Sequence, residues 1–185
     1  MRQLIRETGM GFRPAAILLA ANAAGIFAAL GRETLSAEAV AQKLAASQRG
    51  TEIVLNALVS LGFLQKHDRL FEIHPEARPY LLPGSPKYLG DMLRHDFNLM
   101  KRWVHLPQII RTGEPVRHET EAENPAEKTD FILAMGNLGW QSAETFAQKV
   151  DLSTVKRLLD LGGGPAVFSI TLCQKFPQLE SVVFD

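Results

Sequence analysis

Several features that direct a chain to a particular class of protein are missing from this sequence. It has one cysteine, Cys173, in 185 residues, which excludes an intrachain disulfide framework and favours a reducing compartment, the cytoplasm. Lysine and arginine together number 20, as do aspartate and glutamate, so the formal net charge is zero. We therefore expect no overall electrostatic attraction to nucleic acid or to an anionic membrane.

Metal ligands and membrane spans are also missing from the sequence. The five histidines are scattered without the spacing of metal ligands, so no metal site is predicted. The apolar run over residues 15–30 follows three arginines and resembles a targeting segment. Asn22 interrupts that run, which is also short for a membrane span of about 20 residues. We interpret the run as a buried helix.

The most informative stretch is residues 157–185, where apolar runs flank three glycines. The runs at 158–161 and 182–184 are typical of strands buried on both faces. Between them, the glycines at 162–164 are followed by Pro165, which suits the first turn of a helix. The order predicts a strand, a glycine loop, a helix and a second strand. A right-handed crossover makes the two strands parallel.

A ligand site is expected where these two strands end, because open parallel sheets bind ligands at the carboxyl ends of their strands. The glycine loop lets a ligand approach the backbone, and the carboxylate of Asp185 suits the two hydroxyls of a ribose. The dinucleotide pattern G-x-G-x-x-G needs a third glycine where Val167 stands, and the Gly-Lys-Ser/Thr of a P-loop is absent. The candidate left is S-adenosylmethionine, which has a ribose and no phosphate. An ordinary strand–helix–strand unit with a glycine turn is the alternative.

The N-terminal part predicts helices followed by a hairpin. A single helix over residues 14–30 is apolar on most sides, and because one small domain cannot bury such a helix, we expect a partner subunit. Ser36 and Thr51 are interpreted as the N-caps of two further helices. Short strands at 63–65 and 70–73 complete a winged-helix arrangement.

A winged helix often binds DNA, with its third helix in the major groove. Here that helix, residues 51–61, carries a single charged residue, Glu52, instead of the arginines and lysines that contact phosphates and bases. We therefore predict that the domain does not bind nucleic acid. A winged-helix DNA-binding regulator is kept as an alternative.

Two long helices are expected between the hairpin and the glycine stretch. The first begins at Pro86 with Ser85 as its cap, is kinked by Pro107 and ends at Gly113. The second is capped by Asn124 and runs to about residue 150. Two glycines near its middle either loosen it or let another element approach closely. One face of this predicted helix carries Phe131, Met135, Leu138, Ser142 and Phe146.

The glycine stretch resembles the first motif of the S-adenosylmethionine-dependent methyltransferases. From Asp160 it reads Asp-Leu-Gly-Gly-Gly-Pro-Ala and follows the pattern Asp-x-Gly-x-Gly-x-Gly, with Ala166 in place of the last glycine. Over residues 12–185, the order of a buried helix, a winged helix, two long helices and this motif is similar to that of the small-molecule O-methyltransferases. These include the plant caffeic-acid type and bacterial tailoring enzymes. The stretch Leu82-Pro-Gly-Ser-Pro86 is also similar.

The resemblance implies a mainly α fold with a winged-helix N-terminal dimerisation domain, followed by the first β-α-β unit of an α/β Rossmann-like methyltransferase domain. We expect the winged-helix dimerisation domain, with its long helix, over residues 1–113. A linker and connecting helix would cover 114–150, and a truncated S-adenosylmethionine-binding unit 151–185. The resemblance further implies a homodimer through the N-terminal helices, because the winged helix of this family dimerises instead of binding DNA.

The resemblance also implies a reaction and residue roles. The reaction is methyl transfer from S-adenosylmethionine to a hydroxyl of a small aromatic or polyketide-like molecule. The residues implied to bind the cofactor are Asp160, Gly162, Gly163, Gly164 and Asp185. Phe131 and Met135 match positions that line the substrate pocket, and a role in the helix core is the equal alternative for both.

No catalytic residue is assigned within this sequence, because the catalytic base of the family is expected beyond Asp185. We therefore expect the 185-residue chain alone to be inactive. A dimerisation or scaffold module without activity is the other alternative.

Overall fold

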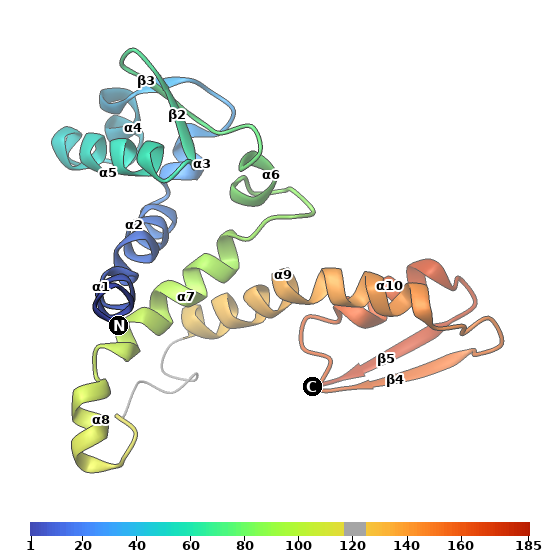
Figure 1. Ribbon diagram of the computed structural model, residues 1–185. Helices are drawn as coiled ribbons and strands as arrows, with labels where there is room; N and C mark the ends of the chain where they lie inside the picture. Colours follow the sequence, from blue (N-terminus) through green and yellow to red (C-terminus); the bar gives the residue numbers. More distant parts are fainter. Residues whose placement is uncertain (117–124) are drawn as a thin grey trace. The chain divides into compact units, whose positions relative to one another are not determined.

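The computed structural model describes residues 1–116 and 125–185. The chain divides into two compact units, Met1–Glu114 and Pro115–Asp185 (Figure 1). Both are mainly helical, and each contains a small sheet. A membrane crossing would need a longer and more apolar helix than any in the described ranges.

The first unit packs helices around a three-stranded sheet. Its elements follow the chain in the order α1 (Arg2–Met10), α2 (Phe12–Ala23), α3 (Ile26–Leu30), β1 (Leu35–Ser36), α4 (Ala37–Lys43), α5 (Gln48–Ser60), β2 (Leu64–His67), β3 (Leu70–Ile73), α6 (Arg78–Leu81), α7 (Gly90–Trp103) and α8 (Leu106–Thr112).

The prediction of one helix over residues 14–30 is wrong. Helix α2 ends at Ala23, and α3 begins at Ile26 after Gly25, whose φ is +81°. Glycine adopts this left-handed conformation without the steric cost of a Cβ, so the chain turns inside an otherwise continuous apolar run. Within the single chain this run is buried on one side only, since Ala20, Ala24 and Ala28 are exposed. Burial of the remaining surface by a partner subunit stays a prediction.

The caps of the next two helices are partly as predicted. Ser36 Oγ accepts a hydrogen bond from the Ala39 N–H at 3.1 Å, which confirms it as the N-cap of α4. Helix α5 begins earlier than expected, because Ser47 Oγ accepts from the Gly50 N–H and takes the role predicted for Thr51. Thr51 is instead buried within the first turn of α5.

The small sheet has the order β1-β3-β2, and both of its pairings are antiparallel. The hairpin of β2 and β3 pairs Leu64 with Ile73, and β1 adds a short third strand that the sequence did not indicate. The core of this unit lies between the sheet and the helices. Its largest fully buried side chains are Phe27, Leu30, Val40, Leu55, Leu58, Phe71 and Ile73.

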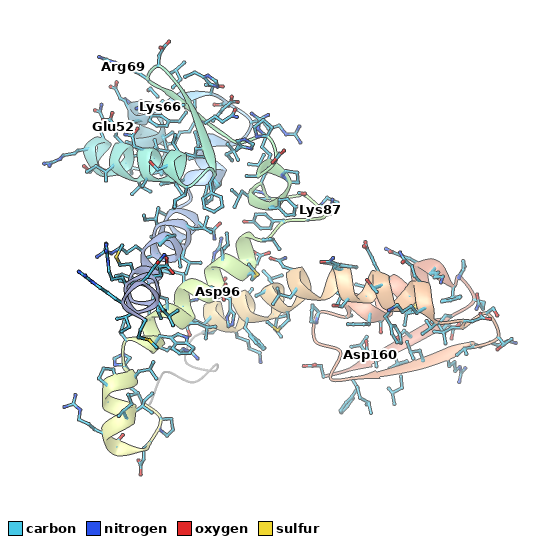
Figure 2. The ribbon with its side chains drawn as sticks, in the orientation of Figure 1. Glu52, Lys66, Arg69, Lys87, Asp96 and Asp160 are labelled. Carbon is cyan, nitrogen blue, oxygen red and sulfur yellow. The ribbon has the colours of Figure 1, made fainter. Side chains whose placement is uncertain are left out.

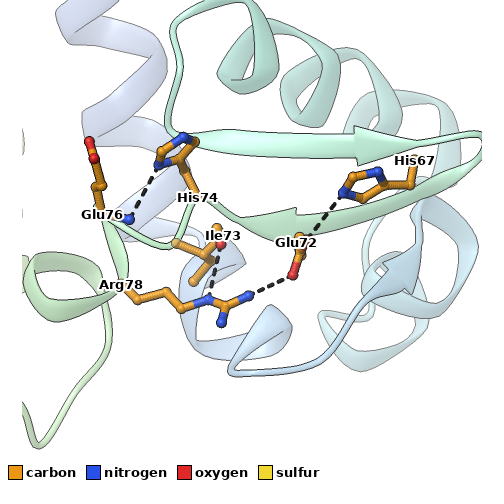
Figure 3. A network of polar contacts seen from close by, with 6 residues as sticks. All are labelled: His67, Glu72, Ile73, His74, Glu76 and Arg78. Carbon is orange, nitrogen blue, oxygen red and sulfur yellow. Dashed lines mark hydrogen bonds and ion pairs between the residues drawn. The ribbon is translucent and has the colours of Figure 1, made fainter.

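A polar network fastens α6 to this hairpin (Figure 3). The carboxylate of Glu72 on β3 pairs with the Arg78 guanidinium of α6 and lies 3.2 Å from His67 Nε2 of β2. Arg78 Nε also donates to the Ile73 carbonyl at 3.1 Å. The guanidinium therefore holds α6 by two separate bonds, one to a side chain and one to the backbone.

The predicted helix from Pro86 to Gly113 is two helices, α7 and α8, which separate at Val104 and His105. Pro107 lies in the first turn of α8, where its missing N–H costs little. Ser85 does not cap α7, because its Oγ accepts from the Lys87 N–H in the preceding loop. The start of α7 is fixed instead by buried Asn22 of α2, whose Nδ2 donates to the Gly90 carbonyl at 2.8 Å.

The second unit places helices on one side of a pair of parallel strands (Figure 1). Its elements are α9 (Pro125–Lys149), β4 (Arg157–Leu161), α10 (Val167–Lys175) and β5 (Glu180–Phe184). The strands pair Leu158 with Ser181 and Asp160 with Val183, so their carboxyl ends lie at the same edge. The predicted cap Asn124 lies outside the described residues.

Helix α9 packs through small residues. A Cβ on Gly139 would lie 2.6 Å from Val167 Cγ2, so this glycine lets the start of α10 approach closely, while Gly136 faces Pro165, where a Cβ would lie 3.6 Å from Pro165 Cβ in ordinary contact. Ala143 and Ala147 are buried on the same helix. The residues predicted to share one face of α9 are largely uncovered in this chain, since Phe131, Leu138, Ser142 and Phe146 are exposed and Met135 is half-buried.

The prediction that both strands are buried on both faces is also wrong in this structure. Helix α10 covers one face. On the other face Leu159 and Leu161 of β4 are 60% and 69% exposed, and Val182 and Phe184 of β5 are 64% and 69% exposed. Continuous apolar runs mark strands that are covered on both faces in α/β sheets. Within the described residues, the face that carries these four side chains has no covering helix.

The inner face of α5 gives a test of this packing. Leu55 is fully buried, whereas Ile53 on the same helix is 60% exposed. We expect Leu55→Ala to lower the free energy of unfolding by about 2–5 kcal/mol through the cavity it leaves. Ile53→Ala should change it by about 0.5 kcal/mol or less. Urea denaturation at one protein concentration checks both values, and equal losses at the two positions would contradict this placement of α5.

Candidate cofactor site

Three glycines form the loop between β4 and α10, and they are needed for two different reasons. Gly162 and Gly164 have φ values of +69° and +50°, which side chains rarely tolerate. Gly163 has no positive φ, but a Cβ there would lie 2.7 Å from Val183 Cγ1 and 2.8 Å from the Asp160 carboxyl. Backbone conformation therefore requires two of the glycines, and close packing requires the third.

The loop is bonded to the end of β5. The Gly162 N–H donates to the Phe184 carbonyl at 2.8 Å, and the Gly164 N–H donates to Asp185 Oδ2 at 2.8 Å. The structure thus brings Asp185 and the glycine loop together, although they are 21 residues apart in sequence. A Cβ on Gly162 or Gly164 would meet no atom within 4 Å, so that side of the loop is open.

Asp160, the acid that precedes the loop, faces α10 (Figure 2). Its Oδ2 accepts a hydrogen bond from Ser169 Oγ at 2.6 Å, beneath Gly163. Asp160 and Asp185 therefore occupy different places around the loop. One carboxylate supports it from within the fold, and the other meets it at the exposed end of β5.

Comparison with known families assigns both parts of the chain. A model of the O-methyltransferase dimerisation domain matches residues 7–82, and a model of the O-methyltransferase domain matches residues 88–185. The chain belongs to the O-methyltransferase family. The resemblance found in the glycine motif and in the order of elements is thereby confirmed.

Individual relatives agree with the family. The chain is 30% identical to 3-hydroxy-5-methyl-1-naphthoate 3-O-methyltransferase of Streptomyces sahachiroi, over 98% of the chain and 54% of the relative. It is 29% identical to acetylserotonin O-methyltransferase of Bos taurus, over 98% of the chain and 58% of the relative. The chain spans about half the length of the curated relatives it matches.

Solved structures share the fold. The crystal structure of human N-acetylserotonin methyltransferase in complex with SAM is similar at a TM-score of 0.84 and 26% identity. The match covers 100% of this chain and 59% of the human one.

Ala166 is where this member of the family departs from the glycine pattern, and the structure shows the consequence. Ala166 is the N-cap of α10 with φ 60° and ψ 21°, in the left-handed region. An L-residue with a Cβ costs roughly 1–2 kcal/mol there, whereas glycine costs almost nothing. The chain therefore keeps the backbone conformation that favours glycine and accepts the strain of a methyl group.

The two residues predicted for the substrate pocket lie on α9. Met135 is half-buried beside Gly136, which packs against Pro165 after the glycine loop. Phe131 lies one turn nearer the start of α9 and is 38% exposed. Met135 is thus next to the residue that contacts the loop region.

At the turn before β4, the Ser153 N–H donates to Asp151 Oδ1 at 2.9 Å and, with the Ser153 side chain, lowers the pKa of this exposed carboxyl. Within residues 1–116 and 125–185, no group of three or more His, Cys, Asp or Glu side chains is placed to hold a metal ion.

Sequence reasoning missed two serines of this site. Ser169 on α10 is 4% exposed and bonds to Asp160, and Ser181 on β5 lies 2.8 Å from Ser169 Oγ. The sequence gives little indication of either role, because a single serine in an apolar helix or strand is usually a surface residue. The motif acid was the clue, since a carboxylate that is not exposed needs a donor nearby.

The strain at Ala166 predicts an unusual sign for a glycine substitution. Ala166→Gly should raise the free energy of unfolding by about 0.5–1 kcal/mol, because relief of roughly 1–2 kcal/mol exceeds the entropic cost of glycine. Ala20→Gly in the middle of α2 is the matched control and should lower it by about 1 kcal/mol. Chemical denaturation of both variants decides this, and a loss of stability at both positions would show that Ala166 is not strained.

Proposed function

We propose that the chain is the N-terminal part of an S-adenosylmethionine-dependent methyltransferase that transfers a methyl group to a hydroxyl of a small aromatic or polyketide-like molecule. The observation that carries this proposal is the contact between Asp185 Oδ2 and the Gly164 N–H at 2.8 Å. It places an exposed carboxylate beside an open glycine loop at the carboxyl ends of two parallel strands, where α/β sheets bind their ligands.

The residues present fit this cofactor. The open sides of Gly162 and Gly164 admit a ligand to the backbone, and Asp185 offers carboxylate oxygens to the hydroxyls of a ribose. Gly163 and Asp160 shape the loop from beneath. When bound, S-adenosylmethionine supplies the methyl group as part of a sulfonium ion. The protein's part would be to hold that methyl in line with the acceptor oxygen.

The acceptor class rests on relatives. Their names specify a hydroxynaphthoate, acetylserotonin and tetracenomycin as the molecules concerned. All three relatives are O-methyltransferases by name. Phe131 and Met135 are our candidates for lining the acceptor pocket, because both lie on the helix whose Gly136 contacts Pro165. No catalytic base is assigned among the described residues.

The proposed architecture assigns residues 1–113 to a winged-helix dimerisation domain and 114–150 to a linker and connecting helix. Residues 151–185 would form the first β-α-β unit of a Rossmann-like domain. The match of the dimerisation model to residues 7–82 supports the first assignment. The parallel pairing of β4 and β5 around α10 supports the last.

The proposed homodimer forms through the N-terminal helices, which carry exposed apolar side chains. Leu4, Ile5 and Phe12 are each about 60% exposed on α1 and α2, and burying them against a second copy removes apolar area from water. Sedimentation velocity at micromolar concentration should show a dimer. A single monomeric species there would contradict the proposal.

Binding to nucleic acid is not part of the proposed function. On α5 the exposed side chains include Glu52, and the hairpin lysine Lys66 donates its Nζ to Asn56 Oδ1 at 2.8 Å within the domain (Figure 2). Arg49 and Arg69 are exposed, but with a formal net charge of zero the chain has no overall attraction to phosphates. The proposed compartment is the cytoplasm, which the lone Cys173 favours.

The role of Asp185 predicts a loss of cofactor affinity. Asp185→Ala should weaken S-adenosylmethionine binding about tenfold or more, because hydrogen bonds from ribose hydroxyls to a carboxylate contribute on the order of 1.5–3 kcal/mol. Glu180→Ala removes an exposed carboxylate from the other end of β5 and should leave the affinity unchanged. Isothermal calorimetry on the three proteins measures both effects. An unchanged dissociation constant in Asp185→Ala would remove the basis of the ribose assignment.

A further inference from the structure

A carboxylate lies in the layer between α10 and the sheet, where apolar contacts alone would be enough for packing. Asp160 and Leu158 of β4 lie in register with Val183 and Ser181 of β5, on the face that α10 covers. Ser169 of α10, which is 4% exposed, points into this layer. A charged group in such a place costs free energy unless it is hydrogen-bonded.

Two short hydrogen bonds satisfy the polar side chains of this layer. Ser169 Oγ donates to Asp160 Oδ2 at 2.6 Å, and Ser169 Oγ and Ser181 Oγ are 2.8 Å apart. No buried side-chain nitrogen or oxygen in the described part of the chain lacks a partner. The three residues come from β4, α10 and β5, so the network joins the two strands and the helix of the unit that contains the glycine loop.

The donor and the acceptor of each hydrogen bond follow from the number of hydrogens that each group carries. A serine hydroxyl has one hydrogen to donate, and an ionised carboxylate only accepts. Ser169 gives its hydrogen to Asp160, so its oxygen must accept the hydrogen of Ser181. The chain of bonds therefore runs from Ser181 through Ser169 to Asp160. Ser169 is its essential middle member, because removing it disconnects both neighbours.

The glycine loop rests on the end of this network. A Cβ on Gly163 would lie 2.8 Å from both Cγ and Oδ2 of Asp160, so the backbone of Gly163 packs directly on the carboxyl that Ser169 holds. A rotation of the Asp160 side chain would move atoms that are already in tight contact with the loop. The rotamer of Asp160 thus sets the position of Gly163, and the hydroxyl of Ser169 sets that rotamer.

We propose that Ser169 is a positioning residue for the cofactor loop, oriented by Ser181 and acting through Asp160. In this arrangement Asp160 supports the loop from beneath and does not itself touch the cofactor. The inference deepens the proposed function, since it concerns the same loop. Its geometric part, the fixing of Gly162–Gly164 by Ser169, holds whether or not the ligand is S-adenosylmethionine.

Amide hydrogen exchange measured by NMR on the full chain without ligand tests the geometric part. The reporters are the bonded N–H groups of Gly162, Gly164 and Ala166. Ser169→Ala should speed their exchange about tenfold, as expected for the loss of a hydrogen bond to a charged group. Ser181→Ala should speed it only about threefold, because the bond to Asp160 survives.

The double variant gives the sharpest comparison. If Ser181 acts only through Ser169, the loop amides of the double variant with Ser169→Ala and Ser181→Ala should exchange no faster than those of Ser169→Ala alone. Thr171→Val is the matched control, because it removes from the same helix a hydroxyl that donates only to the Val167 carbonyl. It should leave the loop amides within about twofold of the parent rate.

Three results would overturn the proposal. Loop amides that are unchanged in Ser169→Ala would show that the hydroxyl does not fix the loop. Equal acceleration at the bonded amides of Val150 and Phe176, at the ends of α9 and α10, would show a general loss of stability instead of a local one. Additive effects of the two serine substitutions would show that Ser181 acts independently.

A second measurement separates this inference from the proposed function. Calorimetry with S-adenosylmethionine should show about tenfold weaker binding in Ser169→Ala and unchanged binding in Thr171→Val. If the loop amides respond as expected while no form binds S-adenosylmethionine, the positioning role stands and the assigned cofactor is wrong. If Ser169→Ala frees the loop but binds the cofactor as tightly as the parent, the positioning role in binding is wrong.

Discussion

The parallel pairing of β4 with β5 is the constraint on which the candidate site depends. Because Asp160 is in register with Val183 and Leu161 with Phe184, the two strands end at one edge of the sheet. The glycine loop leaves β4 at that edge, and Asp185 follows β5 there. One hydrogen bond from the Gly164 N–H to the Asp185 carboxylate then joins them. A shift of one residue in this register would turn Asp160 away from α10 and separate it from Ser169.

Close contacts at glycines, where no side chain intervenes, contribute to the packing of this unit. Gly139 admits Val167 and Gly163 rests on Asp160, each at a distance that a Cβ would prevent. These contacts bring the start of α10 close to α9 and the loop close to β4. Ala166 is the exception, because the same backbone path requires a left-handed residue and the chain supplies one with a methyl group. The cost is local strain, while the path of the loop is kept.

The parts that sequence predicts well are those set by local chemistry. The order of strand, glycine loop, helix and strand follows from short patterns, and Asp185 is placed by its position after the second strand. Ser36 is recognisable as a cap because its hydroxyl acts on an amide three residues away. The helix break at Gly25 is not recognisable, since one glycine in an apolar run is compatible with a continuous helix.

Larger-scale packing is harder to read from the sequence. On α9 the apolar pattern groups Phe131, Leu138 and Phe146 on one face but does not indicate that the helix buries Ala143 and Ala147, where close approach of α10 favours small residues. On α5 two apolar residues of similar size differ completely, since Leu55 is fully buried and Ile53 is 60% exposed. Ser169 was not predicted either, because its importance comes from Asp160, a residue of another element.

An NMR titration of the chain with S-adenosylmethionine tests most directly whether the glycine loop and Asp185 form a cofactor site. If they do, the amide signals of Gly162, Gly163, Gly164 and Asp185 shift together and saturate with one dissociation constant, while signals from the core of the first unit, such as Leu55 and Phe71, stay in place. Shifts confined to the first unit, or none at saturating ligand, would contradict the assignment of this site.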